Sequence, residues 1–557
     1  SISNIHFKSY INPILNGMRS HYTVTDCTFS KSKCTVSQLL AFVESDITFN
    51  HTEIHDNDAN SQPFFIAVNS TVTLFSLNAS TNFMESRDIR AAFHFHNTSV
   101  LLNNSLFFSN TLKLPLIAIS NYSHIQCTDT TFDFNNAFCI IAIEFESTAK
   151  FEFNSFHSNN CALVAGGLNS TFYLYTSTLT NHNSDEFLIG LSESDIYLSN
   201  CVFKDSNIAS IVYHNLITNY SKQLKIESVS ISNLNSKLSL FGAVNGVVSI
   251  ENILIDKVKS EAEVVIYSQQ GNGTTTIKNA TLISIKSDSK VSTAVSVMNT
   301  TSLTLTDFRM TDNLICGGLF ENTKITVKNS HFLNNQCLPQ GNAIPLAILT
   351  TTLSTGVVIE GTSFENNVAL SGSLFFLNAT SSLKNLFFTK NQAVQGAAVF
   401  SAGSNWTAEN VTFKANNGMA MGGALMLTQT SANINNCSFI ENQAPEGAAV
   451  ILRDSYDVKF SNVFGIRNNS TNGSFINCEG ENTLLTLENI QVDDSFDSAM
   501  FIQFPEKVVL KNANFNCKVK CQNIGKLTPR PIVQIDKKEI EKKNEIVANK
   551  NNNVVEN

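Results

Sequence analysis

The sequence predicts an all-β fold, a parallel β-solenoid in which one short unit is repeated about 21 times. Three observations predict it. A Phe-rich position recurs every 20 to 32 residues, Asn recurs at a fixed place before it, and each unit holds short alternating apolar runs where a helix would need a longer periodic segment. One such unit cannot bury its own apolar side, so neighbouring units must stack.

The first element of each unit is a short strand centred on an apolar anchor, the residue three before the Asn of an F-x-x-N motif. Fourteen of the 21 anchors are Phe. In the predicted stack, equivalent side chains lie about 4.8 Å apart, which places Phe on Phe in the interior. The anchors are Phe7, Phe29, Phe49, Ala79, Phe107, Phe132, Phe156, Leu179, Phe203, Ile231, Ile255, Leu282, Met310, Phe332, Phe364, Phe388, Phe413, Phe439, Phe464, Val492 and Phe515. The predicted core ladder is clearest at Phe332, Phe364, Phe388, Phe413 and Phe439.

The second element is a turn three residues before the anchor, where Asn stands in 11 copies. Asn tolerates left-handed backbone, and stacked amides form ladders between turns. The predicted Asn ladder includes Asn329, Asn385, Asn410, Asn436, Asn489 and Asn512. Small residues follow seven to ten positions after the anchor, as at Gly422-Gly423, and precede a further apolar strand. The longest inserts between units are expected near residues 50–78 and 333–360.

Composition excludes several classes of protein. Of 557 residues, 43% are hydrophobic and 15% are charged, so the chain can bury a large core and is not disordered. The net charge is −9 with no long run of Lys or Arg, so no nucleic-acid partner is expected. No apolar stretch approaches 18 residues, so we expect no membrane insertion by this segment. A leucine-rich repeat shares the period, but its signature lacks the second Asn position and the Gly-Gly-Ala segment.

The repeat resembles that of the chlamydial polymorphic outer membrane proteins, and similar repeats occur in large surface proteins of some protists. The motif F-x-x-N followed by G-G-A-L carries the resemblance, at Phe413–Asn416 and then Gly422–Leu425. It implies a right-handed, single-stranded parallel β-helix of the pectin-lyase type in a cell-surface adhesin or antigen. It covers most of residues 1–525 and is sharpest over 300–475.

The ends of the chain depart from the repeat. We expect residues 1–525 to form the β-helix and residues 526–557, which are charged and Asn-rich, to form a linker or tail. The first ten residues already carry Ile2, Asn4 and Phe7 in register. Because solenoids need a polar cap, we expect the natural protein to continue upstream or another chain to cover this end.

Catalytic and metal sites are not predicted. Glycoside hydrolysis needs paired carboxylates, and polygalacturonases add Gly-His-Gly and Arg-x-Lys motifs. Neither motif occurs. Asp493-Asp494 is interpreted as a solvated turn. Asp56, Asp58 and Asn60 start like a calcium loop, but Ser61 and Ala67 fill later ligand positions. His94 and His96 lie on one strand face without a third ligand, so no catalytic residue, metal or cofactor is assigned.

The cysteines divide by their position in the repeat. Cys27, Cys201 and Cys437 precede the anchor by two residues and are interpreted as small buried residues. Other pairs lie at similar places in neighbouring units or close in sequence, which makes them disulfide candidates. They are Cys316 with Cys337, Cys139 with Cys161, and Cys517 with Cys521. Bridged cysteines would place the protein outside the cytosol.

N-glycosylation sequons number 18, against about 13 expected from composition. Those that occupy Asn-ladder positions are set aside because their amides are needed in the turn. The better candidates sit between units and are Asn50, Asn69, Asn97, Asn121, Asn169, Asn219, Asn272, Asn299, Asn378, Asn405 and Asn469.

The leading hypothesis is a non-enzymatic extracellular or cell-surface structural protein. It would bind a protein or a cell-surface glycan through its faces and inter-turn loops, or assemble with other copies into a larger filament. The alternative is a carbohydrate-binding or polysaccharide-degrading β-helix. Binding of a polysaccharide without catalysis would show as exposed aromatic residues, such as Trp406 or Tyr173, on one face.

Overall fold

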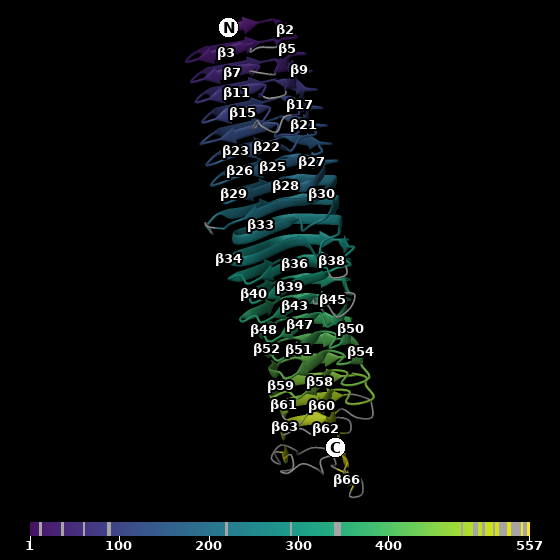
Figure 1. The fold of residues 1–557 in the computed structure, drawn as a ribbon. Coiled ribbons are helices and arrows are strands. Elements are labelled where there is room, and N and C mark those ends of the chain that lie inside the picture. The colour runs from purple at the N-terminus through teal and green to yellow at the C-terminus, as the bar shows by residue number, and fades with distance from the viewer. Residues whose placement is uncertain are drawn as a thin grey trace. The chain divides into compact units, whose positions relative to one another are not determined.

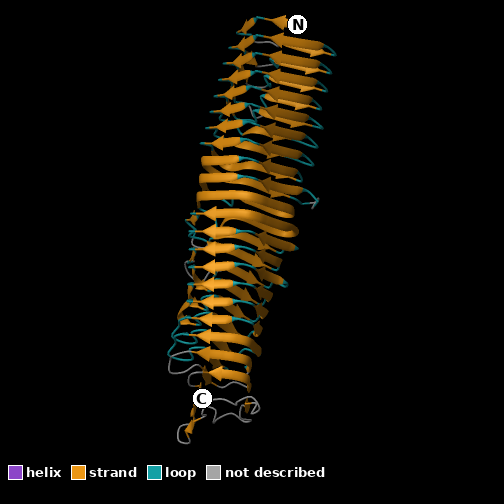
Figure 2. Ribbon diagram, turned by 180° about the vertical axis from the view of Figure 1, so that it is seen from behind, coloured by secondary structure: helices purple, strands orange, loops and turns teal. Residues whose placement is uncertain are grey.

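The computed structural model describes most of the chain. The described residues are 1–10, 14–34, 38–59, 62–85, 91–217, 221–289, 292–338, 347–480, 483–493, 500–503, 507–515, 519–522, 532–535, 547–549 and 554–556. They form strands and turns and contain no helix (Figure 2). The chain divides into two compact units, Ser1–Thr275 and Thr276–Asn557, and each is a parallel β-solenoid.

Each turn of the first unit contributes strands to three parallel sheets, which we call faces A, B and C. Figure 1 shows β3, β7, β11 and β15 one above another on face C. Face A holds the anchors and contains β2 (His6–Lys8), β5 (Thr28–Ser30), β9 (Glu53–His55), β13 (Asn78–Ser80), β17 (Leu106–Phe108), β21 (Thr131–Asp133), β24 (Ser155–His157), β27 (Thr178–Thr180) and β32 (Ser230–Ser236).

Face B precedes face A in every turn. It contains β1 (Ile2–Ser3), β4 (His21–Thr25), β8 (Asp46–Asn50), β12 (Thr71–Phe75), β16 (Ser99–Asn103), β20 (His124–Thr128), β23 (Thr148–Glu152), β26 (Thr171–Tyr175), β29 (Asp195–Ser199) and β31 (Gln223–Glu227). Face C contains β3 (Leu15–Met18), β7 (Leu40–Val43), β11 (Phe65–Val68), β15 (Phe93–His96), β19 (Ile117–Ser120), β22 (Cys139–Ile143), β25 (Ala162–Gly166) and β28 (Asn183–Ser192).

Some strands of this unit depart from the three-face plan. Longer strands run from one face into the next at β30 (Val202–Asn215) and β33 (Phe241–Ser260), and β34 (Val264–Ile283) contains the point at which the unit ends. A short fourth sheet follows face A and is made of β6 (Lys33–Cys34), β10 (Asp58–Ala59), β14 (Phe83–Met84) and β18 (Thr111–Leu112).

The second unit has the same three faces. Face A contains β38 (Arg309–Thr311), β41 (His331–Leu333), β45 (Ser363–Glu365), β49 (Phe387–Thr389), β53 (Thr412–Lys414) and β57 (Ser438–Ile440). Face B contains β37 (Ser302–Thr306), β40 (Lys324–Lys328), β44 (Val357–Glu360), β48 (Thr380–Lys384), β52 (Asn405–Glu409) and β56 (Ser431–Asn435). Three strands, β59 (Asp457–Ile466), β61 (Leu484–Asp493) and β63 (Lys507–Phe515), run through faces B and A.

Face C of the second unit contains β36 (Thr293–Met298), β39 (Cys316–Glu321), β43 (Leu349–Thr352), β47 (Leu374–Leu377), β51 (Val399–Ala402), β55 (Leu425–Thr428), β58 (Val450–Arg453), β60 (Ile476–Glu479), β62 (Met500–Gln503) and β64 (Val519–Gln522). The fourth sheet contains β42 (Gln336–Cys337), β46 (Val368–Ser371), β50 (Gln392–Gln395) and β54 (Asn417–Met421). The remaining strands are β35 (Lys286–Ser287), β65 (Ile532–Ile535), β66 (Val547–Asn549) and β67 (Val554–Glu556).

The predicted parallel β-solenoid is confirmed, with about 19 turns where 21 were predicted. The count differs because each anchor marks a strand and not a complete turn. β1 and β2 have no face C strand before them, and the chain after Phe515 is described only in short segments. Most residues of the predicted tail, 526–557, lie outside the described part of the chain.

Two of the predicted anchors are wrong. Phe29 and Ala79 both pair with Ile54, while Phe49 pairs with Val24 and Leu74 on face B. Phe464 is one residue early, since Gly465 pairs with Phe439 and Val492. In both turns the anchor position is held by a residue other than Phe. The nearby Phe49 is buried, and the nearby Phe464 is half-buried.

Moving the anchor to Ile54 removes one of the predicted inserts. Intervals of 25 residues now separate Phe29 from Ile54 and Ile54 from Ala79, so residues 50–78 form an ordinary turn. The other predicted insert lies between Phe332 and Phe364, which pair in adjacent turns. Residues 339–346 of that segment lie outside the described residues.

The predicted core ladder is a continuous stack of Phe rings. Ring centroids are 4.9 Å apart for Phe332 and Phe364, 5.0 Å for Phe364 and Phe388, 5.3 Å for Phe388 and Phe413, and 4.8 Å for Phe413 and Phe439. These side chains have no accessible surface. Interior packing of apolar side chains stabilises the fold, and the stack fixes the register between turns.

Two different Asn columns form ladders. The predicted residues lie at the exposed corner between faces B and A, with left-handed backbone at φ between 48° and 56°. Their amides bond along the column, as from Asn410 Nδ2 to Asn385 Oδ1 at 3.1 Å.

The second column, the Asn of F-x-x-N, is buried, and we call it the inner Asn ladder. It contains Asn57, Asn82, Asn110, Asn135 and Asn159 in the first unit, and Asn313, Asn335, Asn367, Asn391, Asn416, Asn442 and Asn468 in the second. Its amides bond both to the next Asn and to backbone carbonyls, so the buried polar groups of this corner are paired.

Candidate ligand-binding face

The outward side of face B in the first unit carries a cluster of aromatic and charged side chains. In a strand, alternate residues point to opposite faces, so burial of Phe172 and Leu174 turns Tyr173 and Tyr175 outward. Register then places Tyr173 between Lys150 and Tyr197, and Tyr197 opposite Lys225. We call Lys150, Tyr173, Tyr175, Tyr197 and Lys225 the tyrosine patch.

The rings of the tyrosine patch are held by stacking. The centroids of Tyr173 and Tyr197 are 4.8 Å apart with planes 12° from parallel, and Tyr173 lies 5.7 Å from Tyr175. Lys150 Nζ lies 5.7 Å from the centre of the Tyr175 ring, within cation–π range. The three tyrosines are half-buried, so their rings are fixed while part of each side chain remains accessible.

Every charged group of the patch has an opposite charge beside it. Lys150 pairs with Glu152 at 3.0 Å, Lys225 with Glu227 at 2.9 Å, and Lys222 with Asp195 at 3.1 Å. Such partly exposed pairs contribute modest stability, and they keep the face electrically balanced.

Tyrosine ionisation is suppressed at this face. Partial burial raises the pKa of Tyr175, helped by Tyr173, Tyr197 and Glu152. Burial and the nearby Asp195 carboxylate raise the pKa of Tyr197. A hydrogen bond from Lys225 to Glu227 raises the pKa of the ammonium group. The phenols therefore stay neutral hydroxyl groups near neutral pH, suited to contact and hydrogen bonding.

Groups for other chemistry are not brought together. Within the described ranges, no three His, Cys, Asp or Glu side chains lie close enough to hold a metal ion. His94 Nε2 and His96 Nδ1 both lie near Ser120 Oγ, at 3.3 and 3.2 Å. Asp56 receives a hydrogen bond from Thr81, while Asn60 and Asp494 lie outside the described residues. The described part of the chain contains no helix that is long and apolar enough to cross a membrane.

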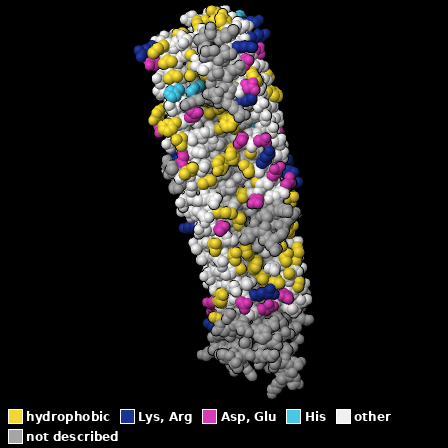
Figure 3. Space-filling view, viewed as in Figure 1, with side chains coloured by type: hydrophobic (Ala, Val, Ile, Leu, Met, Phe, Trp, Pro, Cys, Tyr) yellow, Lys and Arg dark blue, Asp and Glu magenta, His cyan; other side chains and the backbone are white. Residues whose placement is uncertain are grey.

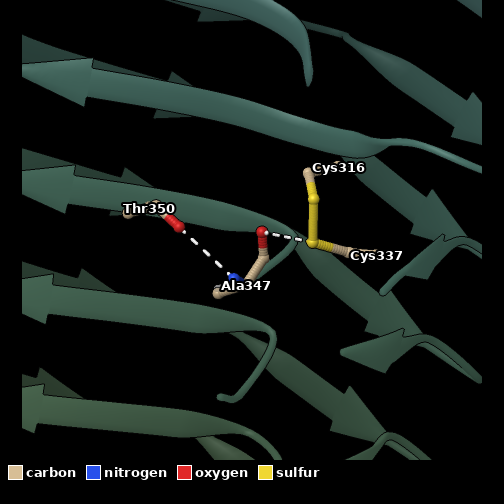
Figure 4. Close-up of a disulfide and its surroundings, with 4 residues drawn as sticks. All are labelled: Cys316, Cys337, Ala347 and Thr350. Atoms are coloured by element: carbon tan, nitrogen blue, oxygen red, sulfur yellow. Dashed lines mark hydrogen bonds between the residues drawn. A yellow bond between two sulfur atoms is a disulfide. The ribbon is translucent and has the colours of Figure 1, made fainter. Parts of the chain in front are cut away.

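Among the described residues, one of the three candidate disulfides is present. Cys316 and Cys337 are bridged, with Cα atoms 4.5 Å apart, and connect adjacent turns (Figure 4). Cys337 Sγ also lies 3.2 Å from the carbonyl oxygen of Ala347, so the bridge packs against the segment that precedes β43 (Figure 4).

The other cysteine candidates differ. Cys139 and Cys161 are free and buried, and register places Cys139 opposite Ala162, one residue from Cys161. Burial raises the pKa of Cys139 and raises that of Cys161 to about 12, so both remain thiols. Cys517 lies outside the described residues, which leaves its pairing with Cys521 open. Cys27, Cys201 and Cys437 are each 1% exposed, as predicted.

Six sequon residues share one corner. Asn69, Asn97, Asn121, Asn169, Asn299 and Asn378 all lie between faces C and B with φ between 48° and 56°. In several copies the next residue supplies a buried hydroxyl to the turn before it; Ser45 N donates to Ser70 Oγ, and Ser70 N to Thr98 Oγ1. The Ser or Thr that supplies this hydroxyl therefore serves the fold. Among these six sites it also completes the sequon only at Asn121, through Ser123, because a sequon needs Ser or Thr two residues after the Asn.

The other sequon residues are scattered. Asn272, Asn405 and Asn469 are exposed, and Asn50 is half-buried. Asn219 lies outside the described residues.

The two aromatic residues proposed as signs of polysaccharide binding behave differently. Tyr173 points outward, whereas Trp406 is only 3% exposed and pairs in register with Ser381 and Ala432. The sequence signal for the tyrosine patch was the outward position of aromatic residues in two consecutive units, at 171–175 and 195–199. On the side of the molecule seen in Figure 3, Lys, Arg, Asp and Glu are interspersed and form no single-charge field.

Comparisons with known proteins identify a fold neighbour. No family model matches the chain. No curated protein matches it either. Among solved structures, an alginate lyase of family PL6, AlyGC, matches with 10% sequence identity and a TM-score of 0.23, over 93% of this chain and 96% of that one. The parallel β-solenoid is shown by the strand pairing of the chain itself.

Proposed function

We propose that this protein is a non-enzymatic binding protein of the extracellular space or cell surface, which holds a partner protein on the tyrosine patch. The observation that supports this most is the column Lys150–Tyr173–Tyr197–Lys225, where register stacks two tyrosines between two lysines on a rigid sheet.

Tyrosine suits this role for a physical reason. It offers a large amphipathic contact area with few rotatable bonds, and it is enriched among residues that dominate binding energy. Stacking of Tyr173 on Tyr197 fixes both rings before binding, so less side-chain entropy is lost in the complex. Flanking ion pairs form a polar rim.

An adhesion assay tests the proposal directly. Beads coated with the protein should bind cells, and Tyr173→Ser with Tyr197→Ser should reduce bound beads at least tenfold. Tyr122→Ser, which removes a tyrosine that is 65% exposed outside the patch, is the matched control and should bind normally. Protease treatment of the cells should abolish binding, whereas glycosidase treatment should not.

Two results would contradict the proposal. Binding that is unchanged in the double variant would show that the patch is not the contact. New reducing ends or unsaturated products from any polysaccharide incubated with the protein would support the enzymatic alternative, a polysaccharide-degrading β-helix.

The proposed location has its own measurement. Mass spectrometry of the native protein under non-reducing conditions should find Cys316 bridged to Cys337 and glycans on exposed sequons such as Asn469. Free thiols at both cysteines with no glycan on any sequon would favour an intracellular scaffold.

A further inference from the structure

A concave surface lies on face B of the second unit, distant in sequence from the tyrosine patch. This groove of about 360 Å³ crosses five successive strands, β48, β52, β56, β59 and β61. With strands about 4.8 Å apart, it is roughly 19 Å long. Its volume falls within the range of ligand sites.

The groove is lined mainly by uncharged hydrogen-bonding groups. Of its eleven lining residues, only Asp457 and Lys459 are charged, and both lie on β59. Thr407 and Asn433 sit opposite each other in register at its centre, and both are exposed. Within the described part of the chain, neither side chain has a hydrogen bond, unlike the exposed ladder asparagines Asn410 and Asn436.

We propose that this groove binds an uncharged, hydroxyl-rich oligosaccharide lying across the strands. A row of hydroxyl and amide groups matches a ligand whose own groups are hydroxyls, and both can donate and accept. An anionic sugar is disfavoured because Asp457 faces the same groove and Lys459, the cation among its lining residues, is already paired with Glu488 at 2.9 Å. This inference goes beyond the proposed function, since it concerns another unit and another class of ligand.

The only tryptophan of the chain gives a direct assay, because Trp406 lines the groove. Excitation that selects Trp should report saturable changes in emission when neutral hexasaccharides of glucose, mannose or xylose are added. Calorimetry on the same samples measures affinity. Asn405 also lines the groove, so the assay requires protein in which mass spectrometry shows that Asn405 is unmodified.

Substitutions locate the binding. Thr407→Ala with Asn433→Ala should weaken the affinity at least tenfold. Thr326→Ala is the matched control, because Thr326 is an outward threonine on β40 that does not line the groove, and its affinity should be unchanged. All three side chains are on the surface, and thermal unfolding of each variant verifies the fold.

Three results would overturn the inference. They are the absence of binding by any neutral hexasaccharide at millimolar concentration, equal affinity in the double variant, and binding of a hexauronate in preference to the neutral sugars. Tyr173→Ser with Tyr197→Ser should leave sugar affinity unchanged, so failure of this inference is separable from failure of the proposed function.

Discussion

At the scale of single residues, the solenoid is most informative where one residue breaks a column. The inner Asn ladder of the first unit runs from Asn57 to Asn159, and His182 takes the next position. Its Nε2 lies 2.6 Å from the carbonyl oxygen of Cys161, while Nδ1 is buried without a partner among the described residues. Burial at this position disfavours the protonated, charged form of the imidazole.

His182 should make the fold acid-sensitive. Burial lowers its pKa from 6.5 to about 4, so the folded state disfavours the proton that the unfolded state binds. Stability is complete above pH 6.5 and declines as pH falls towards 4, by about 3 kcal/mol for this shift. Urea unfolding across this range should show the decline.

The substitution His182→Asn restores the residue type of the ladder and removes the titrating group. The pH dependence of the unfolding free energy between 6.5 and 4 should become flatter in this variant. His124→Asn, at an exposed position on face B, is the control and should retain the slope. Equal slopes in both variants would show that another group causes the acid sensitivity.

At the scale of elements, the two Asn columns differ in what each amide satisfies. Asn416 Nδ2 donates to Asn442 Oδ1 at 3.0 Å and to Phe388 O at 3.0 Å, and Asn416 Oδ1 accepts from Asn391 N. All of these groups are buried. The side chain of Asn410 bonds to exposed amides, those of Asn385 and Asn436.

Asn416→Ala should therefore destabilise the protein more than Asn410→Ala. The first leaves several buried groups unpaired, with a cost of about 3 kcal/mol or more. The second removes exposed hydrogen bonds and places alanine in left-handed backbone, with a cost of about 1 kcal/mol. Denaturant unfolding measures both, and equal losses would contradict the assignment of the inner ladder.

The elements also show how far the sequence determines the fold. Strands, corners and the Phe column were predictable because each turn repeats the same residue types in the same order. The predicted register was wrong at Phe49 and Phe464 because Ile54 and Gly465 hold the anchor positions. The residue type at the anchor alone does not show this, since neither residue is Phe. Glu44, five before Phe49, and Lys459, five before Phe464, were the warnings, since the residue five before the anchor is apolar in every other copy.

The candidate sites were less predictable. Tyr173 could be placed outward by alternation, but its contact with Tyr197 depends on register between turns. The groove beside Trp406 arises from short side chains of five strands that are far apart in sequence. Cys316 and Cys337 are bridged, whereas Cys139 and Cys161 are not. This difference depends on the lateral offset between the two residues in adjacent turns, which the repeat spacing does not determine.

At the scale of the whole molecule, each unit is a one-dimensional stack in which a turn contacts its two neighbours. Stability of such a stack is close to a sum over turns and interfaces, so removal of one complete turn should be tolerated. Residues 110–134 form a complete turn: they begin at one inner-ladder Asn and end before the next, Asn135. Their deletion brings Asn135 onto Asn82 and Phe156 onto Phe107.

The deletion of 110–134 should keep the far-ultraviolet spectrum of a β-protein, and its thermal midpoint should lie within a few degrees of the parent. Deletion of 110–121 is the control, because it removes β18 and β19 but keeps β20 and β21, so every later strand is displaced onto the wrong face. That protein should lose cooperative unfolding. The tyrosine patch follows the deleted turn in the chain, so cell binding should survive the first deletion and be lost with the second. If the two deletions behave alike, the stability of the solenoid does not depend on the register between successive turns.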